Sequence, residues 1–264
     1  MLRTGHCAKV RMWVYVGDSA HPYNVFDFTL SRGRDGPKYF LKDYSQVLLA
    51  DAYGGYDGVV AGNAIVRAGR WAHLRRKVIE AERAAPEIAQ ETVALMRALY
   101  AIEKQDLNAS AEERLRLRQE QSAPMLAELC EKFFDWKEQL LPKHPMAEAI
   151  KYAWGHWDEL NVFLADGAVP IDNNVSEREM KRVVLNRKNS LFVGNVRGGR
   201  TAAILASLTS TCLRHDLDPQ LYLTQLLVNL PALRISDLPA WLPDRWKAAQ
   251  KTRLAASPGQ NPQS

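Results

Sequence analysis

The chain has 264 residues, of which 47% are hydrophobic and 25% are charged, and its net charge is +5. These values are typical of a soluble globular protein of one large domain or two smaller ones, and no apolar run reaches the roughly 20 residues that a membrane span needs. The basic balance favours an anionic partner. The three cysteines are far apart, show no zinc-ligand spacing and indicate no disulfide framework, so we expect a reducing, cytoplasmic setting.

The first part of the chain predicts strands. Residues 10–18 alternate apolar and polar side chains, and residues 25–31 form a second such run after a short connection. Together they predict an antiparallel hairpin. Residues 38–44 are predicted to form a short helix. The continuous apolar run Val47–Leu49 then predicts a strand buried on both faces.

Asp51 follows this strand and precedes two glycines, Gly54 and Gly55. A carboxylate at the end of a buried strand, before a glycine turn, is a frequent site geometry in α/β sheets. An acid that merely ends the strand and caps the next turn explains the same pattern. The residues alone leave both interpretations open.

A long helical region follows. Residues 71–84 predict a basic amphipathic helix, in which we interpret His73 as a packing or hydrogen-bonding residue rather than a catalytic one. Residues 86–166 are almost wholly helical in pattern, and we predict a helical insertion over residues 71–166. Ser110 and Glu113 have the spacing of a capping box. A further helix is predicted over residues 122–141, starting at Ser122.

Residues 170–200 carry most of the net positive charge, with seven Lys/Arg against three Asp/Glu. Asn174 suits a helix N-cap, and Glu177 has the matching capping-box position. Met180, Val183 and Val184 predict the apolar face of this helix, and by spacing Glu177 shares that face. A carboxylate on a buried face is costly unless it is paired, capping or bound to a metal.

Basic side chains lie on the flank of this helix and after it. A phosphodiester-cutting site needs an inward acid within a basic surface, because the metal requires carboxylate and the nucleic-acid backbone requires cations. A Glu177 that only caps its helix, beside a basic face that is only solvated, explains the same residues. The basic residues concerned are Arg178, Lys181, Arg182, Arg187 and Lys188.

The C-terminal part predicts further helices. Gly198 and Gly199 are interpreted as a tight connection, after which Thr201 caps a helix that runs to about Arg214. Asp218 and the following proline are predicted to start a helix that runs through residue 228. The residues after about 246 are rich in Gln, Pro, Ser and Ala and are predicted to be disordered.

Several segments, in the same order along the chain, resemble the transposases of the insertion-sequence-66 family. They run from about residue 9 to residue 230 and include MWVYVGD, LLADAYGGYDG, WAHLRRK, IDNNVSERE and GGRTAAILASL. The order of so many separate segments makes the resemblance specific. Two positions depart from the family pattern: Arg70 stands where a cysteine is usual, and Ser190 replaces a tryptophan.

The resemblance implies a fold, which we divide by residue range. It is an α/β fold with a ribonuclease-H-like core, a mixed sheet, a large helical insertion and C-terminal helices. The core is expected at residues 9–70 and 167–200, with the insertion at residues 71–166 between them. The C-terminal helical region is expected at residues 201–246 and a disordered tail at residues 247–264.

The resemblance also implies chemistry. Asp51 and Glu177 match the second Asp and the Glu of a DDE catalytic set, which holds two Mg²⁺ ions, for which Mn²⁺ is a substitute. The implied reaction is two-metal cleavage of DNA at transposon ends, followed by strand transfer into target DNA. The basic residues named above are implied to hold phosphates. Transposases of this kind commonly act as multimers on paired ends, so a homo-oligomer is expected.

The family's first Asp lies in a strand before the WVYV strand, and Asp18 and Asp27 do not match it. We therefore expect a truncated form that also lacks the family's N-terminal DNA-binding and zinc-binding regions. Because the missing strand lies at the centre of the sheet, we expect reduced stability and little or no transposition by this chain alone. The alternatives are a non-catalytic DNA-binding remnant that interferes with a full-length transposase and, more remotely, a helical scaffold with accidental basic patches.

Overall fold

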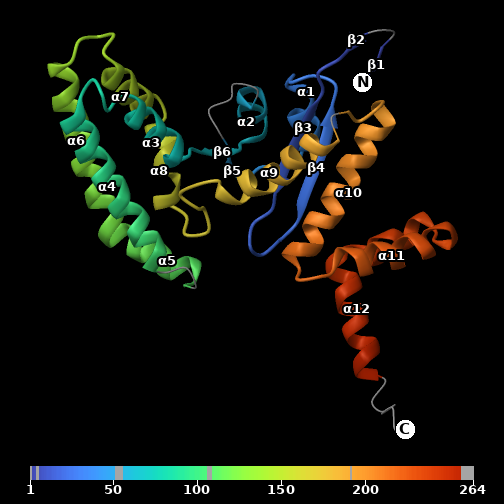
Figure 1. Cartoon of the computed structure of the whole chain (residues 1–264). Coiled ribbons are helices and arrows are strands. Elements are labelled where there is room, and N and C mark those ends of the chain that lie inside the picture. Colours follow the sequence, from blue (N-terminus) through green and yellow to red (C-terminus); the bar gives the residue numbers. More distant parts are fainter. Residues whose placement is uncertain (1, 4–5, 51–55, 106–108, 191, 257–264) are drawn as a thin grey trace. The chain divides into compact units, whose positions relative to one another are not determined.

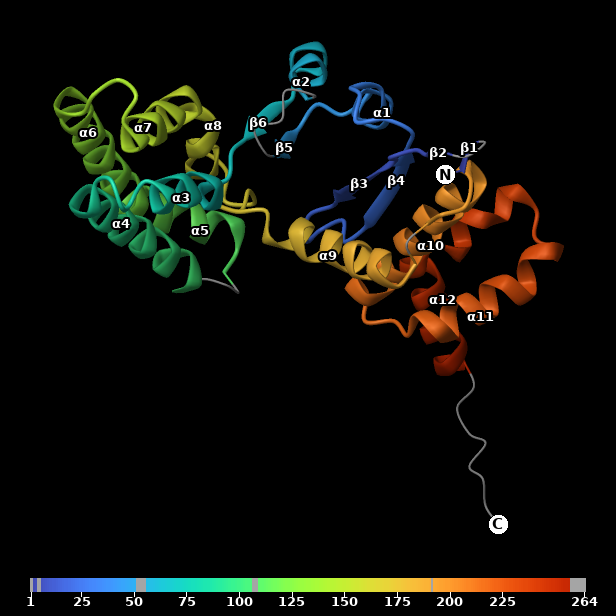
Figure 2. The same cartoon turned by 45° about the horizontal axis from the view of Figure 1, so that its top comes forward.

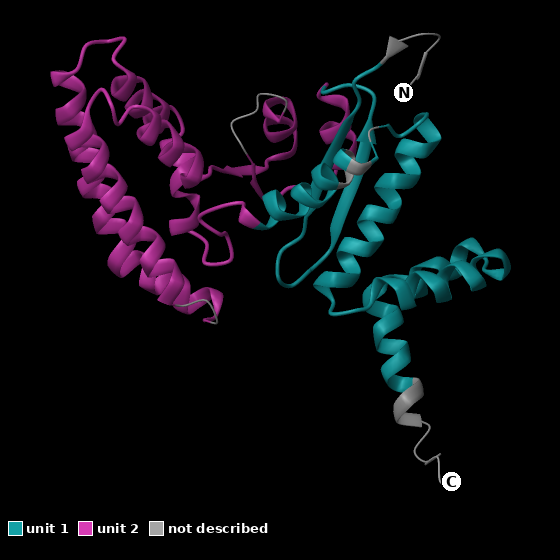
Figure 3. Ribbon diagram, viewed as in Figure 1, with its two compact units in different colours: residues 1–32, 175–264 teal, residues 33–174 magenta. Residues whose placement is uncertain are grey.

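A computed structural model describes residues 2–3, 6–50, 56–105, 109–190 and 192–256 of the chain (Figure 1). The fold is mixed α/β, and helices predominate. The chain divides into two compact units (Figure 3). Unit 1 comprises residues 1–32 and 175–264, and unit 2 comprises residues 33–174.

The predicted hairpin is present in unit 1. Strand β3 (Arg11–Val16) pairs antiparallel with β4 (Asn24–Thr29), in a register that places Arg11 opposite Thr29 and Val16 opposite Asn24. A short pair, β1 (Leu2–Arg3) and β2 (His6–Cys7), precedes it. Along β4, Asn24, Phe26 and Phe28 are buried and alternate with half-buried neighbours. This period of two gives the hairpin one face for packing.

Helix α10 (Val196–Arg214) packs along β4, as the two views in Figures 1 and 2 show. The core of this contact joins Phe26 and Phe28 to Ala203, with Val183 from helix α9 (Asn174–Asn189) packed against it. The expected Gly198–Gly199 connection and Thr201 cap are wrong. Both glycines and Thr201 lie inside α10, and the side chain of Asn195 is the N-cap, accepting from the Gly198 N–H.

Close packing explains why a glycine stands inside α10. A Cβ atom on Gly199 would lie 2.4 Å from a ring carbon of Phe28. The helix therefore approaches the aromatic ring of β4 at a position where only a hydrogen fits. This contact, and not a turn, explains the glycine at position 199.

The C-terminal helices of unit 1 form a second small core. Helix α11 (Pro219–Asn229) begins after an Asp218 N-cap, as predicted, and two 3-10 turns (Leu230–Ala232 and Ile235–Trp241) lead to α12 (Pro243–Ala256). Cys212, Tyr222, Leu226 and Trp246 are buried together.

The expected disorder after residue 246 is wrong as far as Ala256, because α12 continues to that residue. Burial of Trp246 against Tyr222 anchors the helix. The Lys247 ammonium also donates to the His215 carbonyl. The rest of the expected tail, residues 257–264, lies outside the described residues.

Unit 2 begins with helix α1 (Asp35–Phe40), which starts three residues earlier than predicted. Strand β5 (Val47–Leu49) then pairs parallel with β6 (Val66–Ala68), and α2 (Asp57–Asn63) is the crossover between them. The predicted strand at Val47–Leu49 is confirmed, although its side chains are half-buried. In the described part of the chain the strands form separate two-stranded pairs, where we expected one mixed sheet.

The rest of unit 2 is helical, as expected. Its core contains Trp71, Leu74 and Val78 from one face of α3, and the indole N–H of Trp71 donates to the Leu160 carbonyl at 2.8 Å. The predicted capping box of Ser110 and Glu113 is confirmed. The elements are α3 (Trp71–Glu80), α4 (Pro86–Gln105), α5 (Ala111–Leu117), α6 (Ala123–Gln139), α7 (Pro145–Gly155), α8 (Trp157–Asn161) and a 3-10 turn (Val162–Leu164).

The predicted helix start is confirmed to within one residue, because α6 begins at Ala123 with Ser122 at its N-cap position and Pro124 in its first turn, but the chain is already helical before it. A π-helical turn, η1 (Arg118–Ser122), joins α5 to α6 without a break, and the Ala123 N–H donates to the Arg118 carbonyl five residues back. This wider turn carries the chain helically into Pro124, which has no N–H to donate. The buried side chain of Arg118 holds the turn in place through its hydrogen bonds to Glu103 and to three backbone carbonyls.

Within the residues described, no helix is both long and apolar enough to cross a membrane. Cys130 and Cys212 are free thiols.

Candidate functional site

The candidate site begins with the orientation of α9. Among the side chains of α9 that the structure describes, the buried or half-buried ones are Ser176, Glu179, Met180 and Val183. At about 100° per residue, they occupy one arc of the helix. Val183 lies near the centre of this arc and contacts the Phe26–Phe28 core, and Glu179 lies at one edge of the arc. The inward face of α9 therefore includes Glu179.

Glu179 is a buried carboxylate, 5% exposed. Its Oε2 accepts from the Ser210 hydroxyl at 2.5 Å, and Nε of Arg182 lies 3.4 Å from it. Ser210 in turn accepts from the side-chain amide of Asn24 at 2.5 Å. This chain of contacts ties α9 to α10 and β4, and it satisfies a charge that burial would otherwise make costly.

Arg214 completes the network. Its guanidinium donates to the Asn24 side-chain oxygen at 3.0 Å and to the Gly17 carbonyl at 2.8 Å. Burial lowers the pKa of Arg214, and the negative charges of Glu179 and Asp18 oppose that shift. The buried acid of α9 thus has a structural role in fixing this helix on the hairpin.

Our prediction that Glu177 shares the apolar face is wrong. Glu177 is exposed, and so is Val184. Glu177 lies about 160° around the helix from Glu179 and about 120° from Val183. The predicted face was rotated from the observed one, because Val184 of the predicted set is exposed and Glu179, which the pattern did not include, is buried. As a result, the carboxylate of Glu177 is presented outward from the first turn of α9.

Basic side chains share the exposed arc with Glu177. Arg178, Lys181 and Lys188 are all exposed, and by helical spacing they lie within about 100° of Glu177. Arg182 is also exposed, but its guanidinium pairs with Glu179, and this ion pair partly neutralises its charge. The side chain of Arg187 lies outside the described residues. Glu177 is therefore the exposed acid on a basic helix face.

Asp51 lies outside the described residues, directly after Ala50, whose N–H donates to the Ala68 carbonyl beyond the end of β5. Glu177 belongs to unit 1 and the β5–β6 pair to unit 2. The meeting of Asp51 with Glu177 stays a prediction. Across the part of the chain that the structure describes, no group of three His, Cys, Asp or Glu side chains is placed to hold a metal.

Asp172, in the segment before α9, is a buried acid whose partners the sequence did not indicate. Its Oδ1 accepts from the Ala72 N–H at 2.8 Å, and its Oδ2 accepts from the Tyr100 hydroxyl. The first contact satisfies a free N–H in the first turn of α3, so a residue 100 positions away acts as the cap. Burial, and then this hydrogen bond, raise the pKa of Tyr100.

His73 packs with Tyr152, with ring centroids 5.5 Å apart. This agrees with its interpretation as a packing residue. The segment that leads into α9 is therefore fixed to α3 and α4 by Asp172, and the neighbouring helix α7 contributes Tyr152 to the same region of unit 2.

Comparison with known proteins places this chain in a family. Residues 2–201 match the transposase IS66 family. Three curated relatives come from Sinorhizobium fredii (strain NBRC 101917 / NGR234). The uncharacterized protein y4jD is 37% identical over 246 residues, which cover 89% of this chain and 48% of that protein.

The other two relatives are also uncharacterized proteins. Protein y4qI is 33% identical over 256 residues, covering 90% of this chain and 48% of the relative. Protein y4hP is 32% identical over 266 residues, covering 92% and 48%. The chain spans about half the length of these relatives, and no solved structure matches it. The matched residues include both the β5 strand that precedes Asp51 and the α9 helix with Glu177, and this chain belongs to the transposase IS66 family.

Proposed function

We propose that this chain is part of the catalytic region of a DNA transposase, in which Asp51 and Glu177 are two of the acids of a DDE site. The observation that carries the proposal is the outward carboxylate of Glu177 on the basic face of α9. A catalytic acid must reach both metal and substrate, and of the two Glu residues in α9 only Glu177 is exposed. Glu179 is held in the buried network.

The described strands support a ribonuclease-H-like core. An antiparallel hairpin (β3–β4) and a parallel pair with a helical crossover (β5–α2–β6) are both parts of such a mixed sheet. Helices α3 to α8 lie in the sequence between the two acids, which supports the helical insertion that we propose there. We propose that these strands are parts of one core, with Asp51 at the carboxyl end of β5, where sites of α/β sheets commonly lie.

The oxygen ligands of Asp51 and Glu177 suit a hard cation such as Mg²⁺. When bound, Mg²⁺ would activate a water toward the phosphodiester and neutralise charge at the leaving 3′ oxygen. The exposed cations Arg178, Lys181 and Lys188 would hold DNA phosphates beside Glu177. Arg182 and Arg187 complete the proposed DNA-contacting set. The resemblance matches only two of the family's three acids to this chain, so we expect DNA binding with little strand cleavage by the chain alone.

A cleavage assay tests this expectation. The chain is incubated with Mg²⁺ or Mn²⁺ and with DNA that carries the ends of its own insertion element. We expect salt-sensitive binding and weak or no strand cleavage, whereas robust cleavage or joining would show that the two matched acids suffice. If the chain bound no DNA at all, the proposal would be contradicted.

A second experiment tests whether the two acids share an ion. Fe²⁺ replaces Mg²⁺, and hydroxyl radicals generated at the iron cut the nearby backbone. We expect cuts near both residue 51 and residue 177, and the variants Asp51→Asn and Glu177→Gln should each abolish both cuts. Glu179→Gln is the matched control on the same helix and should retain them. Cuts at only one position would contradict a joint site.

A non-catalytic DNA-binding protein that interferes with a complete transposase is the second candidate. The basic, exposed arc of α9 favours it equally, since phosphate contacts need no metal. It predicts DNA binding that is unaffected by Glu177→Gln, together with no iron-dependent cuts at either acid. The iron experiment therefore separates the two candidates.

A further inference from the structure

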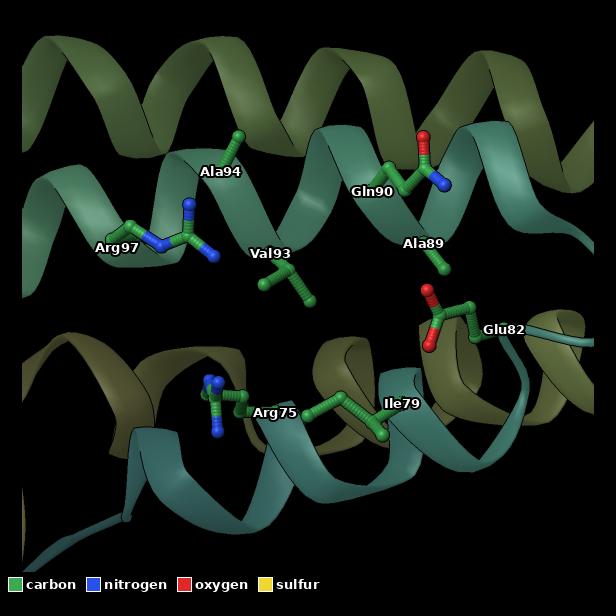
Figure 4. A pocket seen from close by; sticks show the side chains of 8 residues that line it. All are labelled: Arg75, Ile79, Glu82, Ala89, Gln90, Val93, Ala94 and Arg97. Carbon is green, nitrogen blue, oxygen red and sulfur yellow. The ribbon is translucent and has the colours of Figure 1, made fainter.

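A groove in unit 2, between α3 and α4, carries two arginines that face the same space (Figure 4). Its cavity volume is about 340 Å³. Arg75 from α3 and Arg97 from α4 lie toward the end away from the turn that connects the helices, and Glu82 lies at the end beside that turn. The α4 wall consists largely of small side chains, which leave room for an occupant.

Local helical spacing gives neither arginine an acidic partner. The residues three and four positions from Arg75 are Trp71, Ala72, Val78 and Ile79, all uncharged, and helix-surface ion pairs form at these spacings.

The same holds for Arg97, whose neighbours at these spacings are Val93, Ala94, Tyr100 and Ala101. Among the residues that the structure describes, neither guanidinium makes an ion pair or a side-chain hydrogen bond.

Two other basic residues of this unit are neutralised by ion pairs. Lys132 pairs with Glu91 and Glu128, and the buried Arg118 pairs with Glu103. The groove arginines differ from these in being exposed, unpaired and directed into a shared depression. Two uncompensated guanidinium groups, each with a planar fork of donors, suit the oxygens of phosphate groups.

The arginine end of the groove lies next to the segment that leads into α9. The positive charge of Arg75 acts on the phenol of Tyr100, opposing the burial that raises its pKa. Tyr100 donates to Asp172, two residues before α9 begins at Asn174. Both interactions lie within unit 2, and they place Arg75 near the segment of unit 2 that contains Asp172.

We propose that the α3–α4 groove binds the phosphate backbone of DNA through Arg75 and Arg97, as a second contact surface in addition to the basic face of α9. The inference rests on the proposed function, which supplies DNA as the polyanion. Because both arginines are exposed, the groove suits a long charged backbone rather than a single enclosed phosphate ion. Glu82 repels phosphate and confines the contact to the arginine end.

The test measures DNA affinity by fluorescence anisotropy as a function of salt, using a labelled duplex of random sequence and the whole chain. The variants are Arg75→Gln, Arg97→Gln and their combination. Arg76→Gln is the matched control, because Arg76 is exposed on the same helix but does not line the groove. Circular dichroism melting verifies that each variant is folded.

At about 0.1 M salt we expect each groove variant to bind roughly tenfold more weakly, and we expect the slope of log affinity against log salt to fall by about 1 for each arginine removed. The control should bind like the unsubstituted chain. Arg75→Lys combined with Arg97→Lys retains the charge and should largely restore the slope.

Two outcomes would overturn the inference and are distinct from failure of the proposed function. If the unsubstituted chain binds DNA and the double variant binds equally well with the same slope, the groove is not a DNA contact. If inorganic phosphate alone binds the unsubstituted chain tightly in calorimetry, and the double variant loses this binding but retains DNA affinity, the groove is a phosphate-ion site. If the unsubstituted chain binds no DNA, the proposed function and this inference both fail.

Discussion

Glu179 of α9 accepts a hydrogen bond from the Ser210 hydroxyl of α10 at 2.5 Å, and this contact turns the neighbouring acid Glu177 outward. A helix with two acids two positions apart must direct them to nearly opposite sides, because the helix advances by about 200° between them. Burial of one therefore exposes the other. The side of α9 that is buried therefore distinguishes Glu179, the structural acid, from Glu177, the candidate catalytic acid.

Removal of the charge at Glu179 and at Glu177 should change the free energy of unfolding by different amounts. We expect Glu179→Gln to lower the free energy of unfolding by about 2–3 kcal/mol, because it removes the charge that faces Arg182 and weakens the acceptor of the Ser210 hydrogen bond. Glu177→Gln should cost less than about 1 kcal/mol, mainly through the helix dipole. Urea unfolding monitored by circular dichroism measures both. Equal losses for the two variants would contradict this assignment of roles.

Arg118 is 1% exposed, and its guanidinium donates to the carboxylate of Glu103 and to the carbonyls of Phe163, Asp166 and Val169. We expect Arg118→Lys to destabilise the protein by about 3–5 kcal/mol, since an ammonium cannot reproduce the planar fork.

The matched control for Arg118 is Arg116→Lys. Arg116 is 77% exposed in its pair with Glu120, so this change should cost close to zero. The comparison is read from the shift in urea midpoint, and a small shift for Arg118→Lys would refute the structural role.

Gly199 contacts the ring of Phe28 so closely that an added Cβ would lie 2.4 Å from a ring atom. We expect Gly199→Ala to cost about 1–3 kcal/mol through overpacking. Gly62→Ala in α2, where nothing lies within 4 Å of the added atom, should be neutral or slightly stabilising. Thermal unfolding compares them. Combining Gly199→Ala with Phe28→Leu should recover part of the loss, and strict additivity of the two changes would argue against a clash.

Tyr222 is buried, and its hydroxyl donates to the Trp241 carbonyl at 2.7 Å. Burial raises the pKa of this phenol from 10.0 to about 12. Because the folded state holds the proton more tightly than the unfolded state, the stabilisation is complete below pH 10.0 and is lost as the pH rises toward about 12. We expect Tyr222→Phe to be less stable at neutral pH, through the unpaired carbonyl.

The same variant should lose less stability in the alkaline range, because it lacks the titrating phenol. The measurement is the free energy of unfolding at a series of pH values, from neutral to just below the folded-state pKa. Parallel curves for Tyr222→Phe and the unsubstituted chain would show that this phenol does not titrate differently on folding.

The sequence alone determined which elements exist and where several begin. Alternation predicted the β3–β4 hairpin, an apolar run predicted β5, and the capping residues Ser110 and Asp218 predicted the starts of α5 and α11. These features are local, because the groups involved are within a few residues of one another. The order of many motifs also identified the family correctly.

Only the tertiary structure decided which side of α9 is buried, why Gly199 lies within a helix, and what Asp172 and Arg118 bind. In each case the partner is distant in sequence: Glu179 contacts Ser210, Asp172 contacts Ala72, and Arg118 contacts Val169. A weak apolar stripe predicts that a segment is helical. Which side of that helix is buried depends on the surface against which the helix packs. For this reason the sequence could nominate Glu177 as a catalytic acid but could not determine that it faces outward while Glu179 is buried.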